Sequence, residues 1–262
     1  MSSYGYPKYV STAEKKRKAQ KAAATQKKKN PEIDPIVIKG NKLATTWWGK
    51  AWNKNLESYS DYENRIGRGR SYVRYGAVLD LKIDRGRIIS LVQGSRAKPY
   101  RVEIEIKPLP AGVWKAIKET CAGKIDSLQE LVDGKFPEAL SELFTARGKG
   151  LFPAPKEITF DCSCPDWAYM CKHVAAVLYG VGARLDENPA LFFTLRGIGI
   201  EELVTEAIQE KKSAILSKTG VKSRRILKDV DTAAMFGVEL EAADMKRDTS
   251  KETGAAKRKR RS

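Results

Sequence analysis

The stretch CSCPDWAYMCKH, residues 162–173, constrains this sequence more than any other feature. It holds three of the chain's four cysteines and its only histidine. Cys162, Cys164, Cys171 and His173 follow the spacing Cys-x-Cys-x6-Cys-x-His. Three thiolates and one imidazole complete a tetrahedral zinc shell with no open position, which is typical of a structural site. We therefore predict Zn²⁺ as the cofactor and a fold that the metal stabilises.

The local sequence indicates how these four side chains converge. KEITFDC predicts a strand ending at Cys162, and side chains two positions apart on a strand share a face, so Cys162 and Cys164 can point together. Pro165 then interrupts the strand. The apolar stretch after His173 predicts a helix with Cys171 at its cap, since residues two apart within a regular helix do not face each other. The helix N-terminus would stabilise the net negative charge of three thiolates with Zn²⁺.

Four other interpretations of the cluster stay open. A reactive Cys-x-Cys redox pair leaves Cys171 and His173 without a role. An iron–sulfur cluster is more commonly held by four thiolates. A zinc deaminase centre needs a His-x-Glu arrangement, whereas an apolar helix beginning at Val174 follows His173 here. The fourth interpretation is side-chain packing without any metal.

The ligand spacing, followed by an apolar helix, resembles the SWIM zinc finger. Further stretches resemble prokaryotic SWIM zinc finger family proteins, and the resemblance covers most of residues 36–210. The stretches that carry it are ATTWWGKAWNKNLESYSDYENRIGRGRSYVRYG, LVQGSR, YRVEIEI, DSLQELVDG, GLFPAPKEITFDCSCPDWAYMCKHVAAVLYGVGARLDENPALFFTLRG and FGVEL. The resemblance implies zinc binding, with a presumed role in DNA binding or protein interaction. It also implies, for some members, work beside helicases of the chromatin-remodeller type.

The remaining pattern predicts an α+β fold. LATTWWGKAWNKNLESY indicates a helix capped by Thr45 or Thr46, with Trp47 and Trp48 as core anchors. YVRYGAVLDLKI, RIISLVQGS and YRVEIEIKPL predict an antiparallel sheet of at least three strands. AGVWKAIKETCAG predicts a helix that buries Cys121. We expect an antiparallel sheet with helices, a small zinc-stabilised strand–loop–helix unit and basic disordered tails.

Five segments follow from these patterns. They are a basic disordered tail at 1–35, a helix plus antiparallel strands at 36–110, a helical linker region at 111–156, the zinc finger with its following helices at 157–215, and a C-terminal segment with a basic tail at 216–262.

Positive charge is concentrated at the two ends of the chain. The formal net charge is +17, and residues 1–30 hold nine Lys and Arg against one acid. Residues 254–262 add five Lys and Arg and no acid. Such tails suit a polyanion, because each cation that neutralises a phosphate releases condensed counterions. A solubilising tail is the alternative explanation.

The sequence also indicates where the protein works. Residues 1–30 lack the apolar region of a secretory signal. The longest mostly apolar run, 174–183, is far shorter than the ~20 residues that cross a bilayer. Clustered cysteines do not suggest the disulfide framework of a secreted protein. We expect no membrane contact and a cytoplasmic location, with association with the nucleoid as an option.

A second informative stretch is YSDYENRIGRGRSYVRYG, residues 59–76, which we predict to be a loop. Its arginines alternate with tyrosines, and arginine binds phosphate while tyrosine stacks on bases. The alternative is that the arginines pair with Asp61 and Glu63 while the tyrosines pack in the core. The candidate nucleic-acid-binding residues are Arg65, Arg68, Arg70, Arg74, Lys257, Arg258, Lys259, Arg260 and Arg261.

No catalytic constellation is recognisable. The single histidine is assigned to the metal, and no Gly-Lys-Ser/Thr phosphate loop is present. The leading hypothesis is a non-enzymatic zinc protein that binds DNA or RNA, DNA being favoured, in some settings as an accessory to a helicase-type protein. The alternatives are a protein-interaction adaptor that uses the zinc finger and, less favoured, a DNA-processing enzyme.

Overall fold

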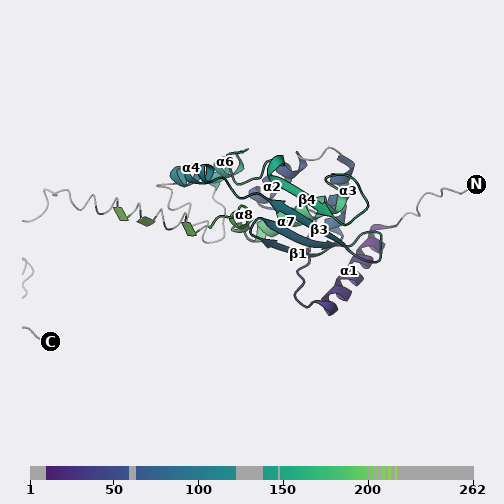
Figure 1. Cartoon of the computed structure of the whole chain (residues 1–262). Coiled ribbons are helices and arrows are strands. Elements are labelled where there is room, and N and C mark those ends of the chain that lie inside the picture. Colours follow the sequence, from purple (N-terminus) through teal and green to yellow (C-terminus); the bar gives the residue numbers. More distant parts are fainter. Residues whose placement is uncertain are drawn as a thin grey trace, which may run out of the picture. The chain divides into compact units, whose positions relative to one another are not determined.

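A four-stranded antiparallel sheet with the strand order β1-β2-β3-β4 organises the fold (Figure 1). The computed structural model describes residues 10–58, 63–121, 138–146 and 148–199, with individual positions between 201 and 216. The strands are β1 Val78–Asp84, β2 Arg87–Val92, β3 Tyr100–Ile106 and β4 Ile158–Cys162. The predicted α+β class and the antiparallel sheet are confirmed.

The strand that carries the first cysteine belongs to this main sheet. β4 pairs with β3, and Cys162 lies opposite Val102. The strand of the predicted strand–loop–helix unit is therefore the fourth strand of the main sheet. The hydrogen bonds between β3 and β4 fix the position of Cys162, the first ligand of the site.

Strand β3 buries one of its two faces, whereas the first four residues of β1 are all buried. On β3 the buried residues are Tyr100, Val102, Ile104 and Ile106, while the residues between them are more exposed. This period of two is the pattern expected for a sheet that packs on one side.

Helix α7, Lys172–Glu187, packs against the sheet and is the central helix of the fold. It contacts all four strands as well as the helices α2 and α3. Residues 173–182 are all buried, so the helix is apolar around its circumference at this level. The apolar run that predicted this helix is confirmed.

Helix α2, Trp47–Glu57, begins where the sequence predicted. The Thr46 hydroxyl accepts a hydrogen bond from the Gly49 N–H at 3.1 Å, as an N-cap does. Trp47 and Trp48 pack against the core. The Trp48 indole donates to the Leu185 carbonyl, and the Trp52 indole donates to the Leu178 carbonyl. The prediction that the tryptophans anchor the core is confirmed.

Helix α3, Glu63–Arg74, replaces most of the predicted Arg/Gly loop. Gly69 is not a glycine that makes a loop flexible, because it lies within this helix. A Cβ at this position would lie 2.5 Å from the Ala175 Cβ, so glycine is required where α3 meets α7. The prediction of a loop was wrong because close helix packing, rather than a turn, demands this glycine.

Helix α1, Thr12–Lys29, occupies most of the region that the sequence suggested as a disordered tail. Ser11 caps it by accepting a hydrogen bond from the Glu14 N–H at 3.2 Å. Ala19 is only 1% exposed and belongs to the core, and Lys18 Nζ donates to the Ser95 carbonyl at 2.7 Å. The described fold therefore begins well before Ile36.

The remaining helices, apart from η2 (Pro155–Glu157), add buried residues to the same core. They are α4 Ala111–Cys121, η1 Glu138–Leu140, α6 Ser141–Thr145, η2 Pro155–Glu157 and α8 Leu191–Leu195. Cys121 is buried, as predicted. Buried residues from all three predicted segments between 36 and 215 belong to one hydrophobic cluster, so those boundaries do not separate independent cores. Most of the predicted C-terminal segment, 217–262, lies outside the described residues.

Candidate metal centre

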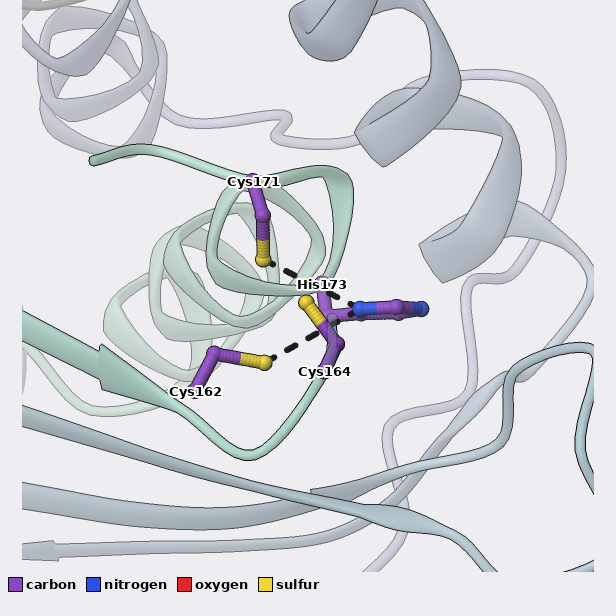
Figure 2. A group of neighbouring side chains, drawn as sticks. All are labelled: Cys162, Cys164, Cys171 and His173. Atoms are coloured by element: carbon purple, nitrogen blue, oxygen red, sulfur yellow. Dashed lines mark hydrogen bonds between the residues drawn. The ribbon is translucent and has the colours of Figure 1, made fainter. Parts of the chain in front are cut away.

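Four side chains converge where β4 meets α7. Cys162 ends β4, Cys164 lies two residues further on, Cys171 is the N-cap of α7 and His173 lies in its first turn. Figure 2 shows them facing a common point. One ligand atom from each lies within 4.8 Å of every other. The predicted position of Cys171 at the cap is confirmed by its extended backbone, with φ −74° and ψ 168°.

The imidazole ring of His173 is held in one orientation. Its Nδ1 atom lies 3.9 Å from the Cys162 sulfur and 3.8 Å from the Cys171 sulfur. The ring packs against Tyr72 and Tyr100, with centroid distances of 5.3 and 4.5 Å. Nδ1 is therefore the atom offered to a metal, which leaves the ring proton on Nε2.

Gly94 makes room for the other side of this ring. A Cβ at Gly94 would lie 3.0 Å from His173 Nε2 and 2.3 Å from a carbon of the Tyr100 ring. Any larger residue would displace the imidazole or the tyrosine. This glycine belongs to the site, although no local sequence pattern marks it.

The ionisation of the thiols favours a bound cation. Hydrogen bonds from Cys162 and His173 lower the pKa of Cys171 to about 4 despite its burial. The hydrogen bond to Cys171, followed by burial, raises the pKa of Cys162, and burial raises the pKa of Cys164. One thiolate is thus stable alone, whereas three at this separation repel each other. A divalent cation removes that repulsion.

Backbone N–H groups already support each sulfur. The backbone N–H groups of Cys164, Asp166 and Val174 act to lower the pKa of the Cys162, Cys164 and Cys171 thiols in turn, which is the direction that favours thiolates. Such outer contacts orient metal ligands and stabilise their negative charge. These backbone groups would add to the stabilisation that a bound cation gives to the three thiolates.

This donor set fits zinc. Three sulfurs and one imidazole nitrogen provide a full tetrahedral shell at a strand end and a helix cap. A redox pair would leave Cys171 and His173 without a role, and an iron–sulfur cluster is more commonly held by four thiolates. Among the described residues, no other His, Cys, Asp and Glu side chains gather closely enough to hold a metal ion. Zinc bound here would stabilise the fold and would leave no position for a substrate.

The zinc loop, which we define as residues 165–170 between Cys164 and Cys171, is anchored on α3. Arg65 forms an ion pair with Asp166, and its guanidinium lies 5.6 Å from the centroid of the Trp167 ring. Trp167 and Tyr169 are 80% and 58% exposed. These exposed aromatic side chains were not singled out from the sequence, although two aromatics in a six-residue loop between metal ligands were a usable signal.

The predicted nucleic-acid-binding arginines divide into two groups. Arg65 and Arg70 form ion pairs with Asp166 and Glu57. Arg68 and Arg74 lie exposed on α3. The C-terminal candidates, Lys257, Arg258, Lys259, Arg260 and Arg261, lie outside the described residues.

No helix in the described part of the chain has the length and apolar character needed to span a membrane.

Comparison with known proteins agrees with this geometry. The SWIM zinc finger family model matches residues 157–181, which cover β4, the zinc loop and the first half of α7. An uncharacterized protein of Mycobacterium tuberculosis (strain ATCC 25618 / H37Rv), Rv2102, is 39% identical over 163 residues. The match covers 62% of this chain and 58% of that relative. No solved structure gives a significant match. The strand, the loop and the helix that bring Cys162, Cys164, Cys171 and His173 together are a SWIM zinc finger.

Proposed function

We propose that this protein binds nucleic acid without catalysing a reaction, and that its zinc finger holds the binding surface in shape. The observation that supports this is a set of exposed cations on α1 and α3 that form no ion pair with another described residue: Lys15, Arg17, Lys18, Lys21, Arg68 and Arg74. Exposed Lys and Arg side chains without acidic partners are available to neutralise the phosphates of a nucleic acid. DNA is favoured over RNA by the resemblance to SWIM proteins.

The metal contributes indirectly. Because the four ligands leave no free position, a phosphate cannot bind the zinc itself. The metal joins the end of β4 to the start of α7, and α3 packs on α7. The cations of α3 therefore depend on the zinc finger for their placement. This arrangement suits a protein of the cytoplasm that associates with the nucleoid.

A salt titration of the full-length protein tests the proposal. The logarithm of the association constant for a duplex DNA should fall linearly with the logarithm of salt concentration. Replacing Arg68 and Arg74 with Gln should reduce the slope by up to about 2, since each phosphate contact contributes about 0.9 on duplex DNA. Removing residues 254–262 should reduce it further.

Lys115→Gln is the matched control for these variants. Lys115 lies on α4, where it pairs with Glu119 at 3.8 Å, so its removal should leave the slope unchanged. If the full-length protein shows no affinity for DNA or RNA even at low salt, the proposal is wrong.

A protein-interaction adaptor is the second candidate, because Trp167 and Tyr169 expose large aromatic surfaces on the zinc loop. Tryptophan and tyrosine are enriched where proteins bind each other. The partner would be a protein such as a helicase. Trp167→Ala should abolish capture of that partner while leaving the salt slope on DNA unchanged. A DNA-processing activity is addressed by nuclease and strand-transfer assays with Mg²⁺ or Mn²⁺.

A further inference from the structure

A groove runs along α1 beside the connection between β2 and β3. Two adjoining cavities form it, with volumes of about 660 Å³ and 280 Å³. Lys18, Lys21 and Gln93 line both cavities, so the two are parts of one elongated hollow. Cavities of this size hold small organic ligands, and their alignment suits a linear polymer better than a single compact molecule.

The helix side of the groove is strongly basic. Lys15, Arg17, Lys18 and Lys21 line the larger cavity, together with one acid, Glu14. None of the four cations forms an ion pair within the described part of the chain, although Lys18 Nζ donates to the Ser95 carbonyl. The positive charge of this wall is therefore available to an anion.

Two tyrosine side chains also line the larger cavity. They are Tyr72 of α3 and Tyr75, which directly follows α3, with 5.1 Å between their ring centroids. Tyr72 also packs edge-on against His173, so the zinc finger fixes its position. A ring held in this way can stack on a nucleobase, a contact worth about 1–3 kcal/mol per base in single-stranded complexes.

Gln93 supplies a hydrogen-bond acceptor in the same wall. Its side-chain nitrogen donates to the carbonyls of Gly94 at 3.0 Å and Arg96 at 2.7 Å, which fixes the orientation of the amide. Gln93 is only 4% exposed, and its Oε1 atom accepts no hydrogen bond from the described residues. A buried amide oxygen of this kind favours a ligand that brings an N–H group, which a phosphate lacks and a nucleobase has.

We propose that this groove binds a segment of single-stranded nucleic acid. The α1 cations contact its phosphates, one base stacks on Tyr72, and an N–H group of a base donates to Gln93 Oε1. A duplex fits these features poorly, because its base faces are stacked and its pairing edges are already occupied. The assignment rests on the proposed function and names the form of nucleic acid that this face takes.

Binding of labelled oligomers to the full-length zinc-loaded protein tests the groove. The probes are oligo-dC, an abasic oligomer of equal length and a duplex. Lys18→Gln combined with Lys21→Gln should weaken oligo-dC binding at least tenfold. The control combines Lys16→Gln and Lys27→Gln, which remove the same charge from α1 positions that do not line the groove, and should change affinity less than threefold.

Ultraviolet crosslinking of the unmodified protein to oligo-dC provides a measurement that needs no variant. Mass spectrometry should place the crosslinks on Tyr72, Tyr75 or the segment 93–99. If no probe binds at low salt, the proposed function fails and the groove assignment with it. If the probes bind but both double variants weaken binding equally, or the abasic oligomer binds as well as oligo-dC, only the groove assignment is overturned. Crosslinks found solely outside these residues overturn it as well.

Discussion

Arg65 of α3 and Asp166 of the zinc loop form an ion pair, with 2.9 Å between Nη2 and Oδ1. Asp166 also accepts a hydrogen bond from the Ala168 N–H at 3.2 Å, so that it shapes the loop as well as anchoring it. The Arg65 guanidinium holds the pKa of the Asp166 carboxyl below its usual range. One residue pair thus connects the metal-binding loop to the helix that carries the exposed arginines.

Asp166→Asn should loosen the zinc loop without removing a metal ligand. The substitution keeps the size of the side chain but removes the charge that Arg65 binds, and we expect a loss of stability of about 1 kcal/mol. Removing a contact that orients metal ligands typically lowers metal affinity 10–100-fold. Zinc should therefore transfer to a chelator several times faster from this variant than from the unmodified protein. Zinc transfer to a chromogenic chelator measures this.

Glu103→Gln is the control for that experiment. It removes another carboxylate that pairs with arginines, Arg87 and Arg101, but on the exposed face of the sheet. Its zinc-transfer rate should match that of the unmodified protein. Equal acceleration in both variants would show that the Arg65–Asp166 pair has no special relation to the metal.

Cys164→Ser should remove the zinc and destabilise the whole fold. Elemental analysis should find one zinc per chain in the unmodified protein and none in the variant, because the tetrahedral set would be incomplete. Loss of the metal separates the end of β4 from α7, so unfolding should begin at a lower temperature and lose cooperativity.

The matched control is Cys121→Ala, which removes the one cysteine outside the cluster. Cys121 is buried in α4, so this variant should keep its zinc and lose only packing energy. Iron in place of zinc, or intact metal binding by Cys164→Ser, would contradict the assignment of the centre.

Gly69→Ala and Gly67→Ala should have opposite effects on stability. An added methyl group at Gly69 would lie 2.5 Å from the Ala175 Cβ, and overpacking of this kind costs about 1–3 kcal/mol. An added methyl group at Gly67 meets nothing within 4 Å, and alanine is favoured over glycine in an exposed helix by about 0.5–1 kcal/mol. Urea unfolding of both variants checks the contrast, and destabilisation of similar size by both would exclude α3–α7 packing as its cause.

The sequence predicted the elements whose pattern is local. Residue spacing and periodicity over short stretches were enough to predict the four metal ligands, the Thr46 cap of α2 and the apolar helix α7. The pairing of β4 with β3 did not follow, because about 50 residues separate the two strands and no local pattern specifies a partner at that distance. The neighbours of His173, which are Tyr72, Tyr100 and Gly94, come from separate segments for the same reason.

Two helices were missed because tertiary contacts override weak local signals. α3 contains Gly67 and Gly69, which lower helix propensity, but its packing on α7 offsets that cost. α1 is rich in lysine and has few apolar residues, so its sequence suggested disorder. Burial of Ala19 and the contact of Lys18 with Ser95 fix it against the fold, and neither contact is visible from the helix sequence alone.

Glu157→Gln should destabilise the protein more than the loss of one ordinary ion pair. Arg196, which follows α8, is only 2% exposed, and its Nη2 atom lies 3.1 Å from Glu157 Oε1. Its Nη1 atom donates to the Lys107 carbonyl at 2.9 Å. Neutralising Glu157 leaves a buried guanidinium without a counter-charge, which costs about 3–5 kcal/mol.

Arg196→Met should cost less, because it removes the buried charge and fills the space with an apolar chain. The Arg196 Nε atom already has no hydrogen-bond partner among the described residues, so its removal relieves a buried polar group. The double variant Glu157→Gln/Arg196→Met should then have the same free energy of unfolding as Arg196→Met alone, because no buried guanidinium remains to lose its counter-charge. Urea unfolding of the three variants measures this. If the loss in free energy of unfolding for the double variant equals the sum of the losses for the two single variants, the two side chains act independently.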